Sequence, residues 1–208
     1  MSHFKTEQED FWAGQFGDAY IDRNWGNTLI AANTALFSKV LHQASQPVKS
    51  VIEFGSNIGL NLKALRGLLP EAELSAIEIN AKAVDKLKAS GDIKVYSQSI
   101  LDFSPDYQRD LVLIKGVLIH INPDMLPVVY KLLYETSKRY ICIAEYYNPT
   151  PVEVPYRGHA GRLFKRDFAG EMLDTYADLR LVDYGFVYHR DGHFPQDDLN
   201  WFLLERRQ

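Results

Sequence analysis

Short apolar runs alternate with helix-like segments along most of this chain of 208 residues, and this alternation restricts its fold more than any other feature. The strand-like runs lie at 50–54, 74–79, 93–96, 110–115 and 140–145. Apolar residues at helical spacing lie at 28–43, 60–69, 81–89, 122–137 and 167–176. Strands separated by helices join in right-handed βαβ units and form a parallel sheet. Two extended segments, 179–188 and 200–205, would add an antiparallel pair, so we expect an α/β fold with a seven-stranded, mostly parallel sheet and helices on both faces.

Composition points to one globular domain and excludes several classes of protein. With 46% hydrophobic and 24% charged residues, the chain has the composition of an average globular protein and not of a disordered one. The single cysteine, Cys142, excludes an intramolecular disulfide and a cysteine-rich zinc site, and we expect no metal. The net charge of −4 argues against a nucleic-acid partner.

The start of the chain is polar and acidic, unlike a signal peptide, and no apolar run reaches the ~18 residues that a membrane helix needs. We therefore expect a cytoplasmic protein without a membrane partner. Residues 1–28 are rich in aromatic side chains, and we interpret them as a helical lid segment on a domain formed by 29–208. The irregular stretch 146–165 is long for a compact domain, which is typical of a functional loop. The sequence leaves the oligomeric state open.

A glycine-containing turn, EFGSNIG at 53–59, links the first strand to the following helix. In an open parallel sheet, ligands bind at the carboxyl ends of the strands. Gly55 permits a tight turn, and Gly59 permits a close approach of a helix or a ligand. The dinucleotide-binding pattern requires glycine at 57, where this chain has Asn57, and the acidic Glu53 would repel a polyphosphate. The turn therefore favours a ligand with a positive group over NAD, although a glycine turn by itself could also serve packing alone.

A second acid, Glu78, ends the second strand, where a carboxylate can accept both hydroxyls of a ribose. After the third strand, Ser99 and Ile100 could clasp an adenine. A ribose ligand with a cationic part and no phosphate matches S-adenosylmethionine, whose sulfonium group the aromatic side chains of 1–28 could enclose. The candidates for binding this cofactor are Glu53, Gly55, Ser56, Asn57, Gly59, Glu78, Ile79, Ser99, Ile100, Lys115, Tyr20, Arg23 and Asn24.

Several segments together resemble one family. They are EFGSNIGLN at 53–61, AIEIN at 76–80, SILDF at 99–103, KGVLIHINPDMLP at 115–127 and IAEYYNPTPVEVPYRGH at 143–159. These segments look like the small methyltransferases associated with pseudaminic acid biosynthesis, and the similarity extends over 11–206. The resemblance implies a Rossmann-like class I methyltransferase domain, S-adenosylmethionine as the donor with S-adenosylhomocysteine as product, and a role in nonulosonic sugar synthesis. It does not supply the methyl acceptor.

Two residues are candidates for a general base that takes a proton from the acceptor. His120 follows the fourth strand, and an imidazole can act as a base near neutral pH. Glu145 ends the fifth strand after an apolar run, where burial would raise the pKa of its carboxyl group. Each has a structural alternative: His120 could fix the strand-to-helix connection, and Glu145 could be a cap or half of an ion pair.

Acceptor-binding candidates follow the fifth strand. Tyr146, Tyr147 and Asn148 would form pocket walls, and the stretch 157–166 carries four permanent cations and no acid. Arginine suits carboxylate or phosphate, so we predict that Arg157, His159, Arg162 and Lys165 bind an anionic acceptor. Alternatively, these cations pair with acids in the next segment, such as Glu171.

The sequence as a whole predicts an S-adenosylmethionine-dependent methyltransferase. Its substrate would be a small anionic metabolite, either a nonulosonic sugar or its nucleotide-activated form. Two alternatives remain: O- or N-methylation of another small molecule, and a non-catalytic protein that binds an adenosyl ligand.

Overall fold

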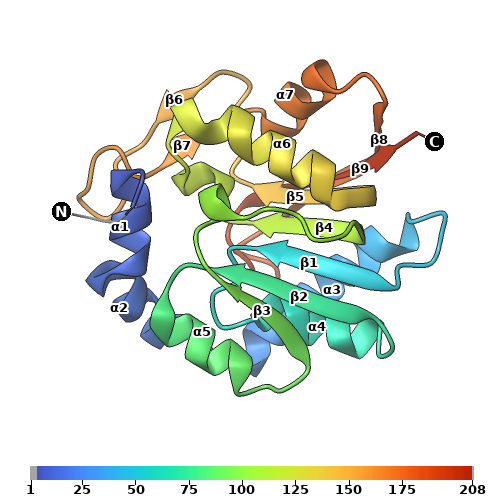
Figure 1. Ribbon diagram of the computed structural model, residues 1–208, viewed down its shortest axis with the longest axis horizontal. Coiled ribbons are helices and arrows are strands. Elements are labelled where there is room, and N and C mark those ends of the chain that lie inside the picture. Colours follow the sequence, from blue (N-terminus) through green and yellow to red (C-terminus); the bar gives the residue numbers. More distant parts are fainter. Residues whose placement is uncertain (1–3, 208) are drawn as a thin grey trace.

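The sheet is the centre of the computed structural model, which describes residues 4–207 (Figure 1). Seven strands of this range form it in the order β3-β2-β1-β4-β5-β9-β8. The strands β1 to β5 pair in parallel, whereas β9 runs antiparallel to both β5 and β8. The structure confirms the predicted α/β fold and the predicted antiparallel pair at the C-terminal end.

The bounds of the elements agree with the predicted segments to within four residues. The strands of the sheet are β1 (Ser50–Phe54), β2 (Glu73–Glu78), β3 (Ile93–Ser97), β4 (Arg109–Lys115), β5 (Ser137–Glu145), β8 (Leu179–Val187) and β9 (Leu199–Arg206). The helices are α1 (Glu7–Ala13), α2 (Gln15–Arg23), α3 (Asn27–His42), α4 (Leu60–Leu68), α5 (Ala81–Lys88), α6 (Leu126–Thr136) and α7 (Phe168–Thr175). The division proposed after residue 28 falls in the first turn of α3.

Alternating side chains of the strands fill two separate cores. In β1, Val51 packs in the core beneath α3, α4 and α5, and its neighbour Ile52 packs in the core beneath α6 and α7. Because successive side chains of a strand point to opposite faces, a strand covered on both sides reads as a continuous apolar run. Figure 1 shows α6 and α7 on one face of the sheet and α3 and α4 on the other.

Two regions differ from the structure that the sequence predicts: the stretch 146–165, predicted to be irregular, and the fifth strand, predicted to begin at residue 140. The stretch 146–165 contains a small hairpin of β6 (Val152–Glu153) and β7 (Phe164–Lys165). Strand β5 begins at Ser137, directly after α6, because Ser137 already pairs with Arg109 of β4. The polar residues at the start of β5 hid this extension from the apolar pattern.

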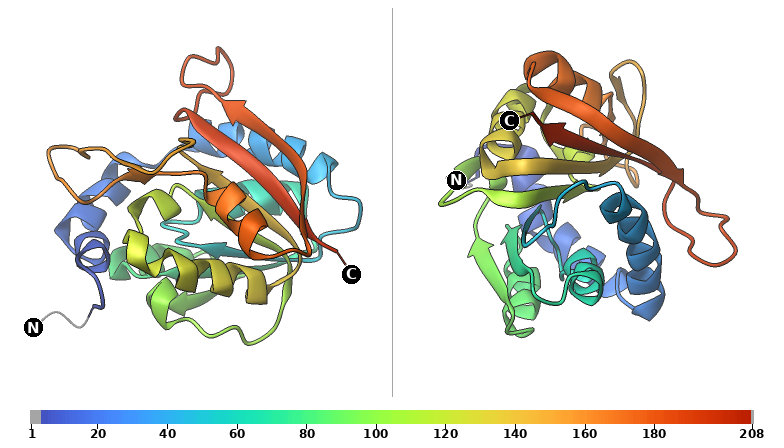
Figure 2. Two further views of the ribbon diagram at one scale, coloured as in Figure 1. Left: turned by 90° about the horizontal axis from the view of Figure 1, so that it is seen from above. Right: turned by 90° about the vertical axis from the view of Figure 1, so that its right-hand side faces the viewer.

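The N-terminal helices stand at the end of the sheet toward which the parallel strands point (Figure 1). Helix α1 begins with a capping box, in which the Thr6 side chain accepts the N–H of Glu9 and the Glu9 carboxylate accepts the N–H of Thr6. Figure 2 shows the β6–β7 arm reaching beside these helices and the loop between β8 and β9 projecting from the body.

Candidate functional site

A cavity of about 490 Å³ lies between the carboxyl ends of the parallel strands and the helices α1 and α2. Its wall comes from segments far apart in the sequence. The polar side chains of the wall belong to Thr6, Gln8, Glu9, Trp12, Tyr20, Asn24, Asn33, Ser56, Asn57, Asn61, Glu78, Asn80, Gln98, Ser99, Lys115, His120, Asn122, His189, Gln196 and Asp197. Ligands of open α/β sheets bind at this end of the strands, so this cavity is the candidate site.

The turn after β1 forms the floor of the cavity. Gly55 has a φ of 74° and Asn57 a φ of 47°, both in the left-handed region that glycine and asparagine tolerate best. A side chain on Gly55 would also meet Val117 at 2.7 Å. The N–H of Asn57 donates to the Glu78 carboxylate at 2.6 Å, so the turn is fastened to the end of β2.

Glu78 is buried and lines the cavity at the end of β2. One carboxylate oxygen accepts the N–H of Asn57 and the other accepts the N–H of Asn80 at 2.8 Å. Burial raises the pKa of this carboxyl group, and the backbone N–H groups of Asn80, Asn57 and Ile79 oppose that rise. A carboxylate has about four acceptor positions, so two of them, one on each oxygen, remain for a ligand.

Glu53 lies beneath the cavity wall and does not line it. Its carboxylate accepts the Asn61 side-chain N–H at 2.5 Å, and full burial raises the pKa of the carboxyl group to about 8. Burial also lowers the pKa of the nearby Lys115 ammonium group, which lines the cavity at the end of β4.

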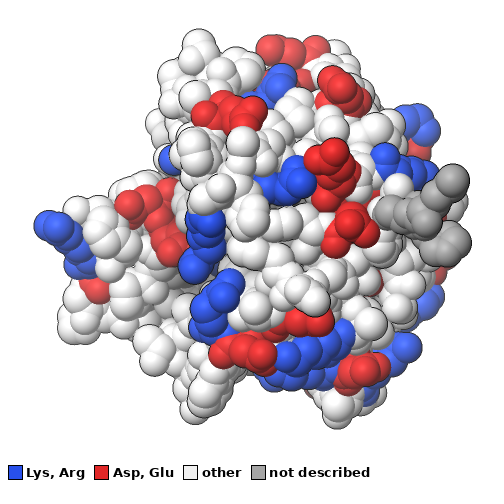
Figure 3. All heavy atoms as spheres, turned by 90° about the vertical axis from the view of Figure 1, so that its left-hand side faces the viewer, with Lys and Arg blue, Asp and Glu red and all other residues white. Residues whose placement is uncertain are grey.

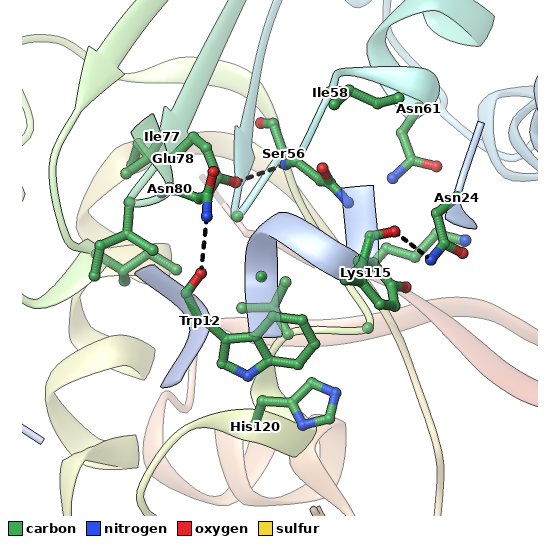
Figure 4. A pocket seen from close by; sticks show the side chains of 18 of the residues that line it. Trp12, Asn24, Ser56, Ile58, Asn61, Ile77, Glu78, Asn80, Lys115 and His120 are labelled. Carbon is green, nitrogen blue, oxygen red and sulfur yellow. Dashed lines mark hydrogen bonds between the residues drawn. The ribbon is translucent and has the colours of Figure 1, made fainter. Parts of the chain in front are cut away.

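Side chains of α1 and α2 cover the opposite wall. The Ser99 hydroxyl donates to the Glu9 carboxylate, and the Asn80 side chain donates to the Trp12 carbonyl at 3.2 Å (Figure 4). Tyr20 and Asn24 line the cavity from α2 and its C-cap. The N-terminal helices are therefore held on the loops that follow β2 and β3.

His120 lines the cavity next to the indole of Trp12, with ring centroids 4.6 Å apart (Figure 4). Its Nδ1–H donates to the Arg162 carbonyl at 2.5 Å, which leaves Nε2 as the unprotonated nitrogen. Burial lowers the pKa of the imidazole to about 4, so His120 is neutral at pH 7. This hydrogen bond ties the turn after β4 to the stretch 157–166, which is a structural role for His120, and the catalytic role stays a prediction.

Glu145 is buried and does not line the cavity. One of its oxygens accepts the N–H groups of Val117 and Leu118, both at 2.9 Å, and so holds the turn after β4. Burial raises the pKa of its carboxyl group to about 7. This geometry corresponds to the capping alternative, because the carboxylate accepts backbone N–H groups of the turn that lines the cavity.

The predicted acceptor residues lie outside the cavity wall. Tyr147 is exposed, and the Asn148 side chain donates to the Thr150 carbonyl at 2.6 Å. Tyr146 is half-buried beneath the ammonium group of Lys165, which lies 5.0 Å from the centre of its ring. Their assignment as substrate-binding residues stays a prediction.

The cations of 157–166 do not gather at one point. Arg157 is exposed, with a φ of 50°, and His159 contacts the ring of Phe11. Arg162 pairs with Glu7 of α1 at 3.2 Å, and its guanidinium also lies over Phe11. His159 and Arg162 thus support α1, whereas Arg166 pairs with Glu171 of α7 at 2.7 Å, which is the alternative considered for these cations.

Arg23 and Gly59, two of the residues predicted to bind the cofactor, lie outside the cavity wall. Arg23 is exposed, and its guanidinium lies over Phe16 at 5.8 Å, whereas the next residue, Asn24, lines the cavity. Gly59 lies outside the wall, and a side chain there would meet Leu87 at 2.7 Å. The absence of a side chain at Gly59 serves the packing of α4 against α5.

The sequence reasoning missed part of the wall. Asn33 is buried in a helix face that is otherwise apolar, and such a polar residue is a recognisable signal. His189, Gln196 and Asp197 come from the loop between β8 and β9, which periodicity does not describe. Glu9 also went unassigned, since its partner Ser99 is distant in the sequence.

The described residues 4–207 contain no group of three or more His, Cys, Asp or Glu side chains that could hold a metal ion. Within the same residues, no helix is both long and apolar enough to cross a membrane.

Comparison with known proteins supports the fold. No protein-family model matches the chain, and a search of curated proteins found no match. Among solved structures, the chain is similar to a magnesium protoporphyrin IX methyltransferase from Synechocystis PCC 6803, which contains S-adenosylhomocysteine. The two chains share 13% sequence identity with a TM-score of 0.70, and the match covers 98% of this chain and 100% of that one. The chain has the Rossmann-like fold of such methyltransferases.

Two other similar structures contain S-adenosylhomocysteine together with a second bound molecule, a desmethyl analogue of plantazolicin in one and 1,6-didemethyltoxoflavin in the other. The plantazolicin methyltransferase, in complex with a desmethyl analogue, has 14% identity, a TM-score of 0.65, and coverage of 92% of this chain and 90% of that one. A 1,6-didemethyltoxoflavin-N1-methyltransferase from Burkholderia thailandensis has 14% identity, a TM-score of 0.67, and coverage of 97% and 87%.

Proposed function

We propose that this protein is a methyltransferase that uses S-adenosylmethionine to methylate a small molecule. The observation that carries the proposal is Glu78 at the end of β2, with one acceptor position left on each carboxylate oxygen, facing a cavity at the carboxyl ends of the strands. The three similar structures contain S-adenosylhomocysteine, the product of this donor.

The wall of the cavity fits the parts of this donor. The two free acceptor positions of Glu78 match the two hydroxyls of a ribose. Ile77, Ile100 and Leu101 supply an apolar surface beside it for the adenine. Acidic groups near the cavity, with few cations, suit a ligand that carries a sulfonium and an ammonium group. When bound, the donor supplies a methyl group that is already activated, so the protein has to align the acceptor and exclude water.

The acceptor is a small molecule in this proposal because the cavity has a volume of about 490 Å³ and is lined by α1, α2 and the β8–β9 loop as well as by the strand ends. On the face that carries α1 and α2, basic and acidic side chains are interspersed and no single-sign stripe is visible (Figure 3). Nucleic-acid binders usually present a clustered basic surface. A cytoplasmic location belongs to the same proposal.

A nonulosonic sugar, or its nucleotide-activated form, is the acceptor that the family resemblance favours. The four cations of the stretch 157–166 would suit an anionic acceptor. Its cations, however, lie outside the wall of the cavity, so the support comes from the sequence resemblance. Another small acceptor with a hydroxyl or amine is the alternative, and a non-catalytic adenosyl-binding protein is a second one.

Calorimetric titration with S-adenosylhomocysteine tests the donor, with NADH as the control ligand. We expect saturable binding of S-adenosylhomocysteine and none of NADH. Transfer of tritium from methyl-labelled S-adenosylmethionine to a deproteinised small-molecule cell extract then tests catalysis. Binding without transfer would favour the non-catalytic alternative, and no binding would contradict the proposal. A purified nonulosonic sugar that gains no label would remove the sugar as acceptor.

A further inference from the structure

The loop between β8 and β9 carries a histidine–carboxylate pair at its base. The Nδ1 atom of His189 lies 2.8 Å and 2.9 Å from the two carboxylate oxygens of Asp198. The backbone N–H of His189 donates to the same carboxylate at 3.0 Å. Because a carboxylate accepts, Nδ1 carries the hydrogen and Nε2 keeps its lone pair. The hydrogen bond to His189 lowers the pKa of the Asp198 carboxyl group, so this carboxylate is ionised.

The base of this loop is fixed although its tip projects from the body (Figure 2). Gln196 is buried, and its side chain donates to the Ala32 carbonyl of α3 at 2.8 Å. The Tyr188 carbonyl accepts the N–H of Asp191 at 3.1 Å and closes the turn after β8. The pair of His189 and Asp198 is therefore held at a defined place beside α3.

His189 lines the same cavity as Glu78. In the sheet order, β2 lies on one side of β1 and β4, and β9 lies on the opposite side. Glu78 ends β2, Lys115 ends β4, and His189 belongs to the loop that enters β9. A donor whose ribose is bound at Glu78 leaves the end near His189 for the acceptor.

The surroundings of His189 suit a polar acceptor. Asp197 and Lys115 line this end, and no hydrogen bond or ion pair joins either charged group to another residue of the described range 4–207. Asn33 of α3 adds an amide to the same wall. These groups can bind hydroxyl, amine or carboxyl groups of a ligand.

We propose that His189, oriented by Asp198, is the general base that takes the proton from the acceptor hydroxyl or amine. This proposal rests on the proposed function. The acceptor oxygen or nitrogen forms a bond to the donor's methyl carbon while the carbon–sulfur bond breaks and its electron pair stays on sulfur. The acceptor's proton passes to Nε2 of His189 and then to water, which balances the charge of the former sulfonium.

His189 is better placed for this task than His120. An imidazole that accepts a proton becomes a cation, and Asp198 stabilises that cation directly. His120 has only the Arg162 carbonyl as a polar partner, and its ring is buried against aromatic side chains. Burial without a charge partner disfavours the protonated form of His120.

The test compares His189→Gln and Asp198→Asn with the parent, and His193→Gln is the control. His193 lies in the same loop but outside the cavity wall. The measured quantities are tritium transfer from labelled S-adenosylmethionine to a deproteinised small-molecule extract, across pH 5–9, and S-adenosylhomocysteine affinity by calorimetry. We expect His189→Gln to lower transfer by about 10²–10⁴-fold with donor affinity within about twofold of the parent.

Asp198→Asn gives a readout that a structural role would not give. The imidazolium loses its charged partner, so Asp198→Asn should lower methyl transfer while S-adenosylhomocysteine affinity and the urea unfolding midpoint stay at the parental values, as they should in His193→Gln. If His189→Gln is folded and keeps the parental rate, the pair only pins the loop and the proposal is wrong. If the parent does not bind S-adenosylhomocysteine, or binds it and transfers no label, the proposed function itself fails and His189 has no acceptor to serve.

Discussion

Replacing Glu78 with glutamine tests the donor site through two measurable effects, and the first is on stability. The Glu78 carboxylate accepts the buried N–H groups of Asn57 and Asn80 at 2.6 Å and 2.8 Å. Glutamine keeps one acceptor oxygen and presents an NH₂ group to the other N–H, which then lacks a partner. An unsatisfied buried donor costs about 1–3 kcal/mol, so urea unfolding of Glu78→Gln should show that loss of stability.

The second effect is on donor affinity. Glu78→Gln also removes one of the two acceptor positions that face the cavity. A hydrogen bond to a charged group contributes about 1.5–3 kcal/mol, which corresponds to about 10–150-fold weaker binding of S-adenosylhomocysteine by calorimetry. The matched control is Glu73→Gln, since Glu73 is the exposed first residue of the same strand and undergoes the same change of charge. That control should bind like the parent.

A ligand analogue separates the lost bond from a disturbed turn. For 2′-deoxy-S-adenosylhomocysteine, which lacks one ribose hydroxyl, the penalty of Glu78→Gln should shrink. An equal penalty for both ligands would place the effect in the turn around Asn57. Parental affinity in a folded Glu78→Gln protein would refute the role of Glu78 in binding ribose.

Three further predictions follow from the same structure. Gly59→Ala should lower the free energy of unfolding by at least about 1–2 kcal/mol, because Gly59 has a left-handed backbone and an added side chain would meet Leu87. S-adenosylhomocysteine affinity should stay at the parental value. The control Gly67→Ala should not lower the free energy of unfolding, because the space around Gly67 is open. Because burial lowers the pKa of His120 from 6.5 to about 4, the unfolded state binds its proton more readily, and stability should fall by up to about 3 kcal/mol as pH drops through this range. The difference between the urea midpoints of the parent and of His120→Asn, followed as the pH falls, measures this loss of stability. If the two proteins show parallel curves of midpoint against pH, the prediction is wrong. Burial raises the pKa of the Cys142 thiol to about 12, so a thiol reagent at pH 8 should label this single cysteine only after unfolding; labelling of the native protein would contradict its burial.

The sequence by itself determined the sheet and one side of the cavity. Five apolar runs separated by helical segments dictate parallel pairing, since a strand buried on both faces has no polar alternation. The turn from Gly55 to Gly59 and the acid Glu78 lie at strand ends, and the carboxyl ends of neighbouring parallel strands meet at one edge. Short-range signals therefore sufficed to place the floor of the site.

Tertiary structure alone decided what covers that floor. The Ser99 hydroxyl meets Glu9, and Arg162 meets Glu7, across long separations in sequence that no periodicity records. The same holds for His189, whose loop enters the cavity only because β9 is inserted beside β5 and Gln196 fastens the loop to α3. Apolar spacing encodes which face of an element is buried, but buried polar groups choose their partners from whatever the folded chain brings within hydrogen-bonding distance.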